Sequence, residues 1–328
     1  MAGKSVLVTG GSGFIGASLV RKLVDLGCRV RVFDNHFRGS MRRLKGYERK
    51  IELLEGDIRK EDLVMKAVEG MDILYHLAFI NGTRHFYEIP DQVLDVGVRG
   101  ALNTLKAAAE HGVERYILAS SSEVYQTPSK VPTDERERIL LEDITNPRYS
   151  YAGGKIISEL LVLNFLRKAR TEAVIFRPHN VYGPDMGYEH VIPELMKKIF
   201  LASDSFSRKE IALEIQGSGE ETRAFCYIDN AVEEILLCAT NGRDGEIYHV
   251  GETREIRILD LIESMGRILD MKIRVLPGAL RPGGTPRRCP DIGKIRALGF
   301  QEKVSLEEGL QRTLDWYRRD LMGRAGGA

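Results

Sequence analysis

The sequence predicts a doubly wound α/β fold, in which a parallel sheet carries helices on both faces. Short apolar, β-branched runs alternate with stretches of helical periodicity over the first 178 residues. The turn after the first run holds three glycines, Gly10, Gly13 and Gly16, and Asp34 closes the second run. Ligands bind such sheets at the carboxyl ends of the strands, so we expect the functional residues at that edge.

The predicted elements follow one another regularly along this part of the chain. The strands are residues 5–10, 29–34, 51–57, 72–78, 115–121 and 172–178. Helical periodicity fills residues 14–27, 91–111 and 151–170, among others. Strands that alternate with helices pair in parallel, because each helix carries the chain back across the sheet.

The pattern changes after Pro178. A loop-rich stretch is followed by a helical run near residues 192–201, a polar strand at residues 210–217 and an apolar helical run within residues 225–239. We interpret this region as a smaller C-terminal domain that is interleaved with the end of the sheet. The predicted sheet domain comprises residues 1–178 and 222–250, and the smaller domain comprises residues 179–221 and 251–328.

Charge and cysteine content exclude several classes of protein. Forty-eight basic residues balance 47 acidic ones, so the composition favours neither nucleic acid nor a membrane surface as a partner. No apolar stretch approaches the roughly 18 residues that span a bilayer. The four cysteines, Cys28, Cys226, Cys238 and Cys289, form no CxxC pair. They predict reduced thiols in a cytoplasmic protein, with no metal site.

The glycine-rich turn "VTGGSGFIG" is the strongest local signal. Glycine permits a tight turn and lets a pyrophosphate approach free backbone amides at the start of a helix. Asp34 follows 18 residues after Gly16, where a carboxylate binds the ribose hydroxyls of NAD and repels the extra phosphate of NADP. Together they predict a Rossmann domain that binds NAD, although Arg38 leaves some tolerance of NADP possible.

The stretch "YSYAGGKIISELL" places Tyr151 and Lys155 four residues apart on a predicted helix. Residues at this spacing share one helix face, so the ammonium can lie near the phenol. A nearby cation favours the phenolate, which lowers the tyrosine pKa and makes a general base. By itself the pair also fits an ordinary amphipathic helix with a partly buried tyrosine and a solvated lysine.

The order of motifs resembles the extended short-chain dehydrogenases that act on nucleotide sugars. These segments are "TGGSGFIG", "HLA" (76–78), "SSSEVY" (120–125), "YAGGK" (151–155), "RPHNVYGP" (177–184), "QGSGEETRAFCYID" (216–229) and "RRCPDIGKIRALGF" (287–300). The resemblance covers nearly the whole chain. It includes UDP-glucuronate decarboxylases, 4,6-dehydratases and 4-epimerases, all dependent on NAD.

The resemblance implies a role for each residue of the motifs. Tyr151 would be the catalytic base, Lys155 would bind the nicotinamide ribose, and Ser121 would complete the hydrogen-bond relay. Asn180, Arg223 and Arg288 would contact the nucleotide sugar, and arginines suit a diphosphate. The cofactor-binding set would be Gly10, Gly13, Phe14, Ile15, Gly16, Asp34, Asn35, Asp57, Ile58, Leu77, Ala78, Tyr151 and Lys155.

The shared first step would oxidise carbon 4 of the sugar to a 4-keto intermediate, which opens several outcomes. In the resemblance, Glu123 occupies the place of a glutamate found in 4,6-dehydratases and UDP-glucuronate decarboxylases, so we favour dehydration or decarboxylation with Glu123 as the second-step base. Ser122 stands where glucose 4,6-dehydratases place an aspartate. Simple 4-epimerisation stays open, as does a glutamate that only orients its neighbours.

Two positions depart from the family pattern. Gly97 stands where an asparagine is usual, and Gln126 follows "EVY" where a glycine is usual. The first puts a hydrogen bond of the helix or site in doubt, and the second suggests altered packing under the sugar.

The remaining expectations concern partners and competing classes. The resemblance implies a UDP-, GDP-, dTDP- or CDP-linked sugar as substrate. It also implies a homodimer in which the helices at residues 91–111 and 151–170 pack against their copies, with Leu160, Leu161 and Leu163 on that face. A catalytically silent NAD-binding protein is one rival, and an NADPH-linked reductase of small carbonyls is another.

Overall fold

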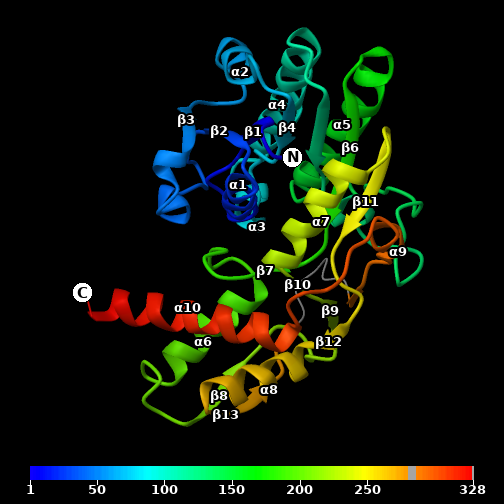
Figure 1. The fold of residues 1–328 in the computed structure, drawn as a ribbon. Coiled ribbons are helices and arrows are strands. Elements are labelled where there is room, and N and C mark those ends of the chain that lie inside the picture. The colour runs from blue at the N-terminus through cyan, green and yellow to red at the C-terminus, as the bar shows by residue number, and fades with distance from the viewer. Residues whose placement is uncertain (280–285, 327–328) are drawn as a thin grey trace.

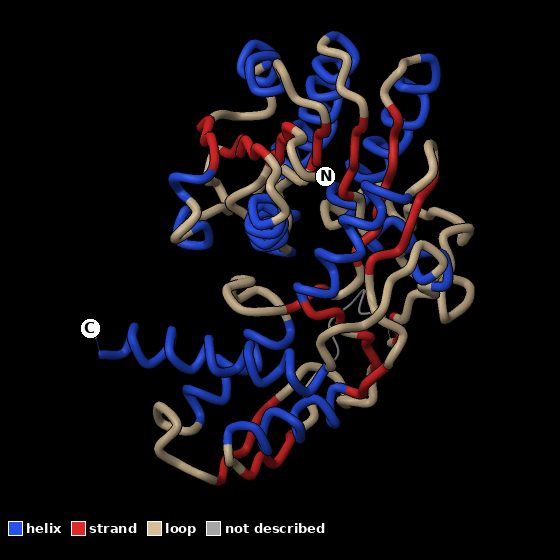
Figure 2. The backbone as a smooth tube through the Cα atoms, viewed as in Figure 1, coloured by secondary structure: helices blue, strands red, loops and turns tan. Residues whose placement is uncertain are grey.

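The computed structural model describes residues 1–279 and 286–326, and its centre is a seven-stranded parallel sheet (Figures 1 and 2). From one edge to the other, the strands are β11 (Glu246–Val250), β6 (Glu172–Pro178), β5 (Arg115–Ala119), β4 (Ile73–His76), β1 (Ser5–Thr9), β2 (Arg29–Asp34) and β3 (Ile51–Glu55). Strand order reverses beside β1, which places a binding crevice there. The predicted fold class is confirmed.

Helices cover both faces of this sheet. One face carries α1 (Phe14–Asp25) and α7 (Ile228–Asn241), and the other carries α2 (Glu61–Val68), α4 (Pro90–Glu110) and α5 (Tyr149–Phe165). Alternate residues of β1 point to opposite faces of the sheet: Val6 and Val8 pack on the face of α1 and α7, and Leu7 packs on the face of α2, α4 and α5. Burial on both sides explains why this strand reads as a continuous apolar run.

A smaller lobe lies at the carboxyl ends of the strands, below the sheet in Figure 1. Its helices are α6 (Val191–Ala202), α8 (Ile258–Leu269), α9 (Gly293–Arg296) and α10 (Leu306–Gly326). Its strands form pairs or triplets: β7 (Val181–Tyr182) with β10 (Cys226–Tyr227), β8 (Glu210–Glu214) with β13 (Lys272–Leu276), and β9 (Thr222–Ala224) with β12 (Glu255–Arg257) and β14 (Arg287–Arg288).

Short elements complete the chain at the same edge of the sheet. Helix α3 (Thr83–Glu88) lies between β4 and α4. The single turns are η1 (Met41–Leu44), η2 (Glu48–Lys50), η3 (Ser122–Tyr125) and η4 (Leu166–Lys168). The turn η3 directly follows β5, so its side chains lie at the carboxyl end of a central strand.

The predicted division into two domains stays a prediction. Strand β11 and helix α7, from the predicted segment 222–250, lie on the main sheet, whereas β9 of the same segment pairs with β12 and β14 in the smaller lobe. Residues 280–285 and 327–328, which the prediction assigned to the smaller domain, lie outside the described residues.

A buried ion pair ties the central elements together. Arg177 on β6 donates to both carboxylate oxygens of Glu159 on α5, from Nε at 2.8 Å and from Nη2 at 2.6 Å. The two residues are 2% and 3% exposed. Glu159 also accepts a hydrogen bond from Ser120 at the end of β5, and Arg177 donates to the hydroxyl of Tyr125 in η3. One pair therefore fixes α5 relative to β5, β6 and η3.

We expect Arg177→Met to destabilise the fold by about 3–5 kcal/mol, because it leaves the Glu159 carboxylate buried without its partner. Urea unfolding followed by circular dichroism measures this change. The control is Arg257→Met, which removes an exposed pair with Asp260 and should shift the unfolding midpoint little. Equal effects of the two substitutions would contradict the structural role of the buried pair.

Candidate active site

The glycine-rich turn connects β1 to α1 and fits a bound pyrophosphate. Gly10 has a φ of +72°, and a Cβ there would lie 2.8 Å from the backbone nitrogen of Ala78. A Cβ on Gly16 would lie 2.2 Å from the carbonyl oxygen of Gly10. Only glycine permits this close path, which leaves the start of α1 open to a negatively charged group.

Asp34 lies at the end of β2 and braces the same turn. Its Oδ2 accepts a hydrogen bond from the backbone N–H of Ser12 at 2.9 Å, and its Oδ1 accepts one from the N–H of His36 at 2.8 Å. The carboxylate is 8% exposed. Since each oxygen can accept more than one hydrogen bond, Asp34 can hold the turn and still face the hydroxyls of a ribose.

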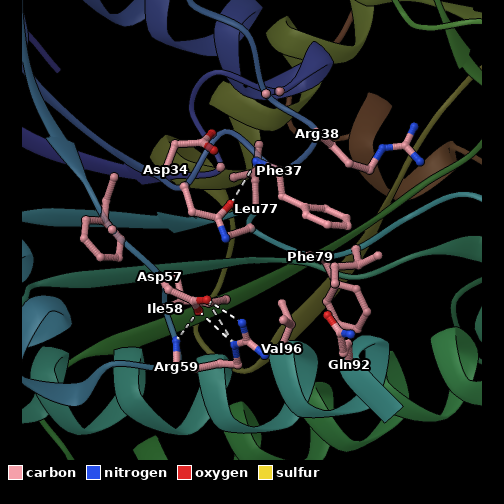
Figure 3. Close-up of a pocket in the computed structure, with 18 residues that line it drawn as sticks. Asp34, Phe37, Arg38, Asp57, Ile58, Arg59, Leu77, Phe79, Gln92 and Val96 are labelled. Carbon is pink, nitrogen blue, oxygen red and sulfur yellow. Dashed lines mark hydrogen bonds and ion pairs between the residues drawn. The ribbon is translucent and has the colours of Figure 1, made fainter. Parts of the chain in front are cut away.

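The first pocket has the lining expected for an adenosine group (Figure 3). Asp34 and Asp57 lie at its upper and lower edges in this view, and Phe79 lies beside Gln92, below Phe37 and Arg38. Its lining includes six predicted cofactor residues besides Gly10 and Gly13: Asp34, Asn35, Asp57, Ile58, Leu77 and Ala78. Sequence reasoning missed Phe37, Arg59, Gln92 and Val96, which also line this pocket and belong to no motif.

Asp57 is held by a neighbour that the sequence pattern did not point to. The guanidinium of Arg59 donates to the Asp57 carboxylate at 2.6 Å, and this hydrogen bond lowers the pKa of Asp57 below its usual range. Below the same strand end, Asn103 of α4 donates to the carbonyl of Ile58 at 2.9 Å. These contacts fix the floor of the adenosine pocket.

The second pocket adjoins the first and brings most of the other predicted residues together. The predicted residues that line it are Gly10, Gly13, Phe14, Ile15, Gly16, Leu77, Ser121, Ser122, Glu123, Tyr151, Lys155, Asn180 and Arg288. Arg148, Glu189 and His190 also line it, although no motif marks them. Arg223 is not among the described residues of this lining. It donates to the carbonyl oxygen of Thr222 at 2.7 Å, and its charge helps to lower the pKa of Glu123.

Tyr151 and Lys155 share one face of α5, as their spacing predicts, and are 7% and 3% exposed. Burial raises the pKa of Tyr151 to about 12, and a hydrogen bond with Ser121 offsets part of this shift. Burial lowers the pKa of Lys155 to about 7. The Lys155 ammonium donates to the carbonyl oxygen of Ala119 at 2.6 Å.

The expected effect of Lys155 on its neighbour is therefore wrong for this structure. A cation was expected to lower the pKa of Tyr151, but the Lys155 Nζ lies 5.8 Å from the centre of the Tyr151 ring and bonds a backbone carbonyl instead. Burial decides the direction of the shift, because desolvation disfavours the phenolate and the ammonium alike.

Glu123 behaves in the opposite way to Tyr151. Burial is the largest single influence and would raise its pKa, but the ion pair with Arg288 and the charges of Arg148 and Arg223 together outweigh it. The pKa of Glu123 is lowered, so this carboxyl stays ionised in its pocket wall. Arg288 comes from β14 of the smaller lobe, so the pair also joins the two parts of the site.

Gln126 and Asn180 both have a positive φ, and the side chain of each bonds a backbone carbonyl nearby. Gln126 has a φ of +49°, a region that favours the glycine usual at this position, and its side chain donates to the carbonyl oxygen of Glu123 at 2.5 Å. Asn180 has a φ of +43° and donates to the carbonyl oxygen of Ala224 at 3.2 Å. Both residues hold loops that form the pocket wall.

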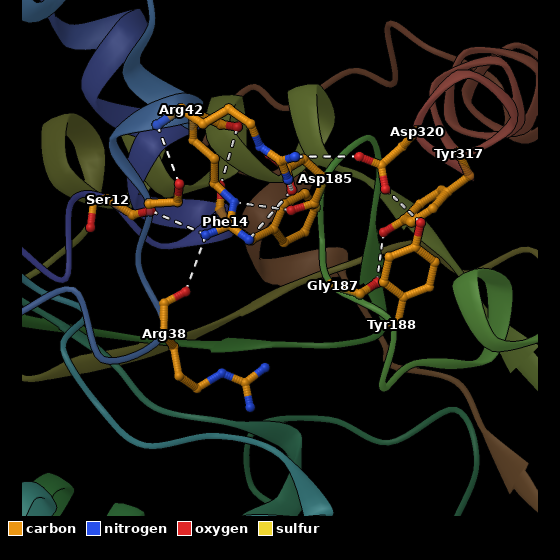
Figure 4. Close-up of polar contacts among 12 residues, drawn as sticks. Ser12, Phe14, Arg38, Arg42, Asp185, Gly187, Tyr188, Tyr317 and Asp320 are labelled. Atoms are coloured by element: carbon orange, nitrogen blue, oxygen red, sulfur yellow. Dashed lines mark hydrogen bonds and ion pairs between the residues drawn. The ribbon is translucent and has the colours of Figure 1, made fainter. Parts of the chain in front are cut away.

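Arginines also link the glycine-rich turn to the smaller lobe (Figure 4). The guanidinium of Arg42 lies between Asp185 and Asp320, with N–O distances of 2.6 and 3.3 Å. Arg43 donates to the backbone carbonyls of Ser12 and Asp185. The cofactor side and the substrate side of the site are thus joined by charge pairs and backbone contacts.

The fold and the site together define the class of the protein. At the carboxyl end of one parallel sheet lie a glycine-rich turn, a strand-end aspartate, a buried serine after β5, and a buried tyrosine and lysine on α5, which is the arrangement typical of short-chain dehydrogenases. A model of the NAD dependent epimerase/dehydratase family matches residues 6–251. The chain belongs to this family, and NAD is its cofactor.

Similar proteins span almost the same length as this chain. UDP-N-acetyl-alpha-D-glucosaminuronate decarboxylase of Bacillus cytotoxicus is 29% identical over 96% of this chain and 98% of its own. dTDP-D-glucose 4,6-dehydratase of Mus musculus is 30% identical over 97% and 90%. The structure of dTDP-glucose 4,6-dehydratase from Streptomyces venezuelae with NAD bound matches with a TM-score of 0.84 and 27% identity over 97% and 98%.

Residues 1–279 and 286–326 contain neither a metal-binding cluster nor a membrane-spanning helix. No group of three or more histidine, cysteine, aspartate or glutamate side chains is placed to hold a metal ion there. In the same described part of the chain, every helix is too short or too polar to cross a membrane.

We expect Asp34→Ala to weaken binding of NAD and to reduce its preference over NADP, because the variant lacks the carboxylate that faces the ribose and repels an added phosphate. Titration with both nucleotides measures the ratio of dissociation constants, which should fall roughly tenfold for each 1.4 kcal/mol lost. Asp25→Ala, an aspartate at the far end of α1 that lines neither pocket, is the control. An unchanged ratio in Asp34→Ala would remove this residue from the ribose site.

Proposed function

We propose that this enzyme oxidises carbon 4 of a nucleotide-linked uronic acid and then releases the sugar carboxyl group as carbon dioxide. The observation that carries the proposal is the ionised Glu123, paired with Arg288 in a pocket wall that Arg148 also lines. The decarboxylase of Bacillus cytotoxicus supports it as a relative that acts on a UDP-linked uronic acid.

The first step needs a proton acceptor beside the carbon 4 hydroxyl. We assign this role to Tyr151, which lines the pocket and shares a hydrogen bond with Ser121. NAD, when bound, accepts the hydride from carbon 4 and later returns it. Lys155 lies one turn further along α5 and lines the same pocket, and we assign it to the nicotinamide ribose.

The second step follows from the chemistry of the ketone. Once carbon 4 is a ketone, a carboxylate on carbon 5 is a β-keto acid. Its bond to carbon 5 breaks, the electron pair moves into the ketone as an enolate, and a solvent-derived proton adds to carbon 5. This route needs no base at carbon 5. It needs cations that hold a carboxylate in place, and Arg148 and Arg288 line the pocket for that role.

Dehydration makes a different demand on the same residues. It requires a base that removes the proton of carbon 5 and an acid that protonates the departing hydroxyl of carbon 6. Glu123 has a lowered pKa, which weakens it as a base, and the Ser122 hydroxyl is a poor acid. We therefore favour Glu123 as the residue that orients Arg288, in place of the base role expected from the sequence.

We expect turnover of UDP-glucuronic acid or UDP-N-acetylglucosaminuronic acid in heavy water to release carbon dioxide and to place one deuterium on carbon 5. Mass spectrometry and NMR of the product measure both. Conversion of a neutral nucleotide sugar to a 4-keto-6-deoxy product, with deuterium on carbon 5 and no release of carbon dioxide, would establish dehydration instead, because the hydride from carbon 4 then returns to carbon 6. A 4-epimer without carbon-bound deuterium would establish epimerisation, because only the hydride moves in that reaction.

Glu123→Gln should still reduce bound NAD but should accumulate the 4-keto sugar, with decarboxylation slowed roughly 100-fold because Arg288 loses the ionic partner that positions it. Tyr151→Phe is the matched variant for the first step, and it should leave bound NAD oxidised. Normal product formation by Glu123→Gln would remove Glu123 from the second step.

We also propose that two copies associate through α4 and α5. Leu94 of α4, and Ile157 and Leu160 of α5, are 37%, 38% and 57% exposed. Leu161 and Leu163, which were expected on the same face, pack partly against the core below. We expect a dimer mass by light scattering at micromolar protein, and Leu160→Glu should weaken it by placing a charge in an apolar contact. A monomer mass for the unmodified chain would refute this assembly.

A further inference from the structure

The departure at Gly97 has a structural counterpart in Phe79. The Phe79 ring lies between α4 and α5, where a Cβ on Gly97 would lie 2.3 Å from its Cζ and a Cβ on Gly154 would lie 2.9 Å from the same atom. A side chain at either position would therefore displace the ring. The asparagine that is usual at position 97 cannot be accommodated beside Phe79 in this position.

The seated ring contacts both members of the proposed proton-transfer pair. The ring centres of Phe79 and Tyr151 are 5.1 Å apart, edge to face at 82°. The Lys155 ammonium lies 4.0 Å from the centre of the Phe79 ring, which is within the range of a cation–π interaction. On the other side of Tyr151, the ring of Phe86 stacks at 4.9 Å and 20°. Two apolar rings thus enclose the phenol.

We infer that Phe79 is a positioning residue of this site. Its ring fits between α4 and α5 because Gly97 and Gly154 have no side chains. There it excludes water from Tyr151 and Lys155 and holds the Lys155 ammonium beside the Ala119 carbonyl. This inference rests on the proposed function in one respect, namely that Tyr151 and Lys155 take part in the reaction.

Titratable and polar groups of the surrounding elements also interact with Tyr151 and Lys155. Tyr151 interacts with Ser121 and Glu123 of the β5 edge and with Arg38 of the loop after β2. Lys155 interacts with Glu159 of its own helix and with His76 of β4. All of these remain when the Phe79 ring is removed, so a change on its removal reports the ring.

The direction of the change follows from desolvation. Water admitted beside Lys155 favours the ammonium and raises its pKa, whereas water beside Tyr151 favours the phenolate and lowers its pKa. Since the base form of Tyr151 is the active one, the rising limb of the pH profile for the first oxidation should move to lower pH. A residue that only fills space would change the rate without moving the profile.

The experiment is a double-mutant cycle of Phe79→Ala and Gly97→Ala in the full chain with its NAD bound. Lysine labelled with ¹³C at Cε reports the titration of Lys155, whose signal is assigned by its loss in Lys155→Met. Reduction of bound NAD by the nucleotide sugar reports the pH profile. Phe206→Ala removes a partly buried ring from the smaller lobe and serves as the control.

We expect Phe79→Ala to raise the Lys155 titration midpoint and to lower the pH of the rising limb, each by about one unit or more. Gly97→Ala should shift both in the same direction, because its Cβ displaces the ring. In the double variant, Gly97→Ala should add little, since no ring remains to be displaced. Phe206→Ala should leave both measurements unchanged.

Two results separate this inference from the proposed function. A Lys155 titration that is the same in Phe79→Ala and in the unmodified protein would overturn the inference, whatever the activity. The other result is a Lys155 titration that shifts in Phe79→Ala although no nucleotide sugar reduces the bound NAD of the unmodified protein. That result would support the role of Phe79 beside Tyr151 and Lys155 and would contradict the proposed reaction.

Discussion

The arrangement of this enzyme depends on the buried ion pair between Arg177 and Glu159. It joins a sheet strand to the helix that carries Tyr151 and Lys155, and through Ser120 and the Tyr125 hydroxyl it reaches the strand end and the turn that carry Ser121 and Glu123. Two fully desolvated charges need a partner with good geometry, which permits only one relative placement of these elements. The pair is therefore a constraint on geometry more than a source of net stability.

The site that this constraint holds has two electrostatically different halves. Around Tyr151, aromatic rings and burial oppose every charged form, so the phenol and the amine both shift toward neutrality. Around Glu123, three guanidinium groups outweigh burial and keep the carboxylate ionised. The halves come from different parts of the chain, because α5 supplies the first and β14 of the smaller lobe supplies Arg288. A substrate with one hydroxyl to oxidise and several negative charges suits this division.

Sequence reasoning located the strands, the glycine-rich turn and most of the site, because these depend on local patterns. Asp34 could be placed from its spacing after the glycine-rich turn, whereas Tyr151 and Lys155 needed the order of motifs along the chain as well as their own spacing. Arg148 and Gln92 could not be found in this way, since their positions in the pockets follow from tertiary packing and they belong to no motif. The direction of the Tyr151 pKa was also missed: helix spacing brings Lys155 to the correct face, but it does not show how deeply both groups are buried or which carbonyl the ammonium bonds. Gly97 was noticed as a departure, but its partner lies 18 positions earlier in the chain.

The place of β11 at the sheet edge has a consequence for the order in which the chain acquires its structure. Its neighbour β6 ends at Pro178, but β11 begins at Glu246, so 67 residues lie between two strands that pair directly. During synthesis from the N-terminus, β6 leaves the ribosome well before its partner and presents an unpaired edge of apolar residues. Helix α7, which packs against the same sheet, also arrives late. The nascent sheet is therefore most exposed to wrong pairing while the smaller lobe's first segment is being made, and it is protected only when residues 228–250 have been added.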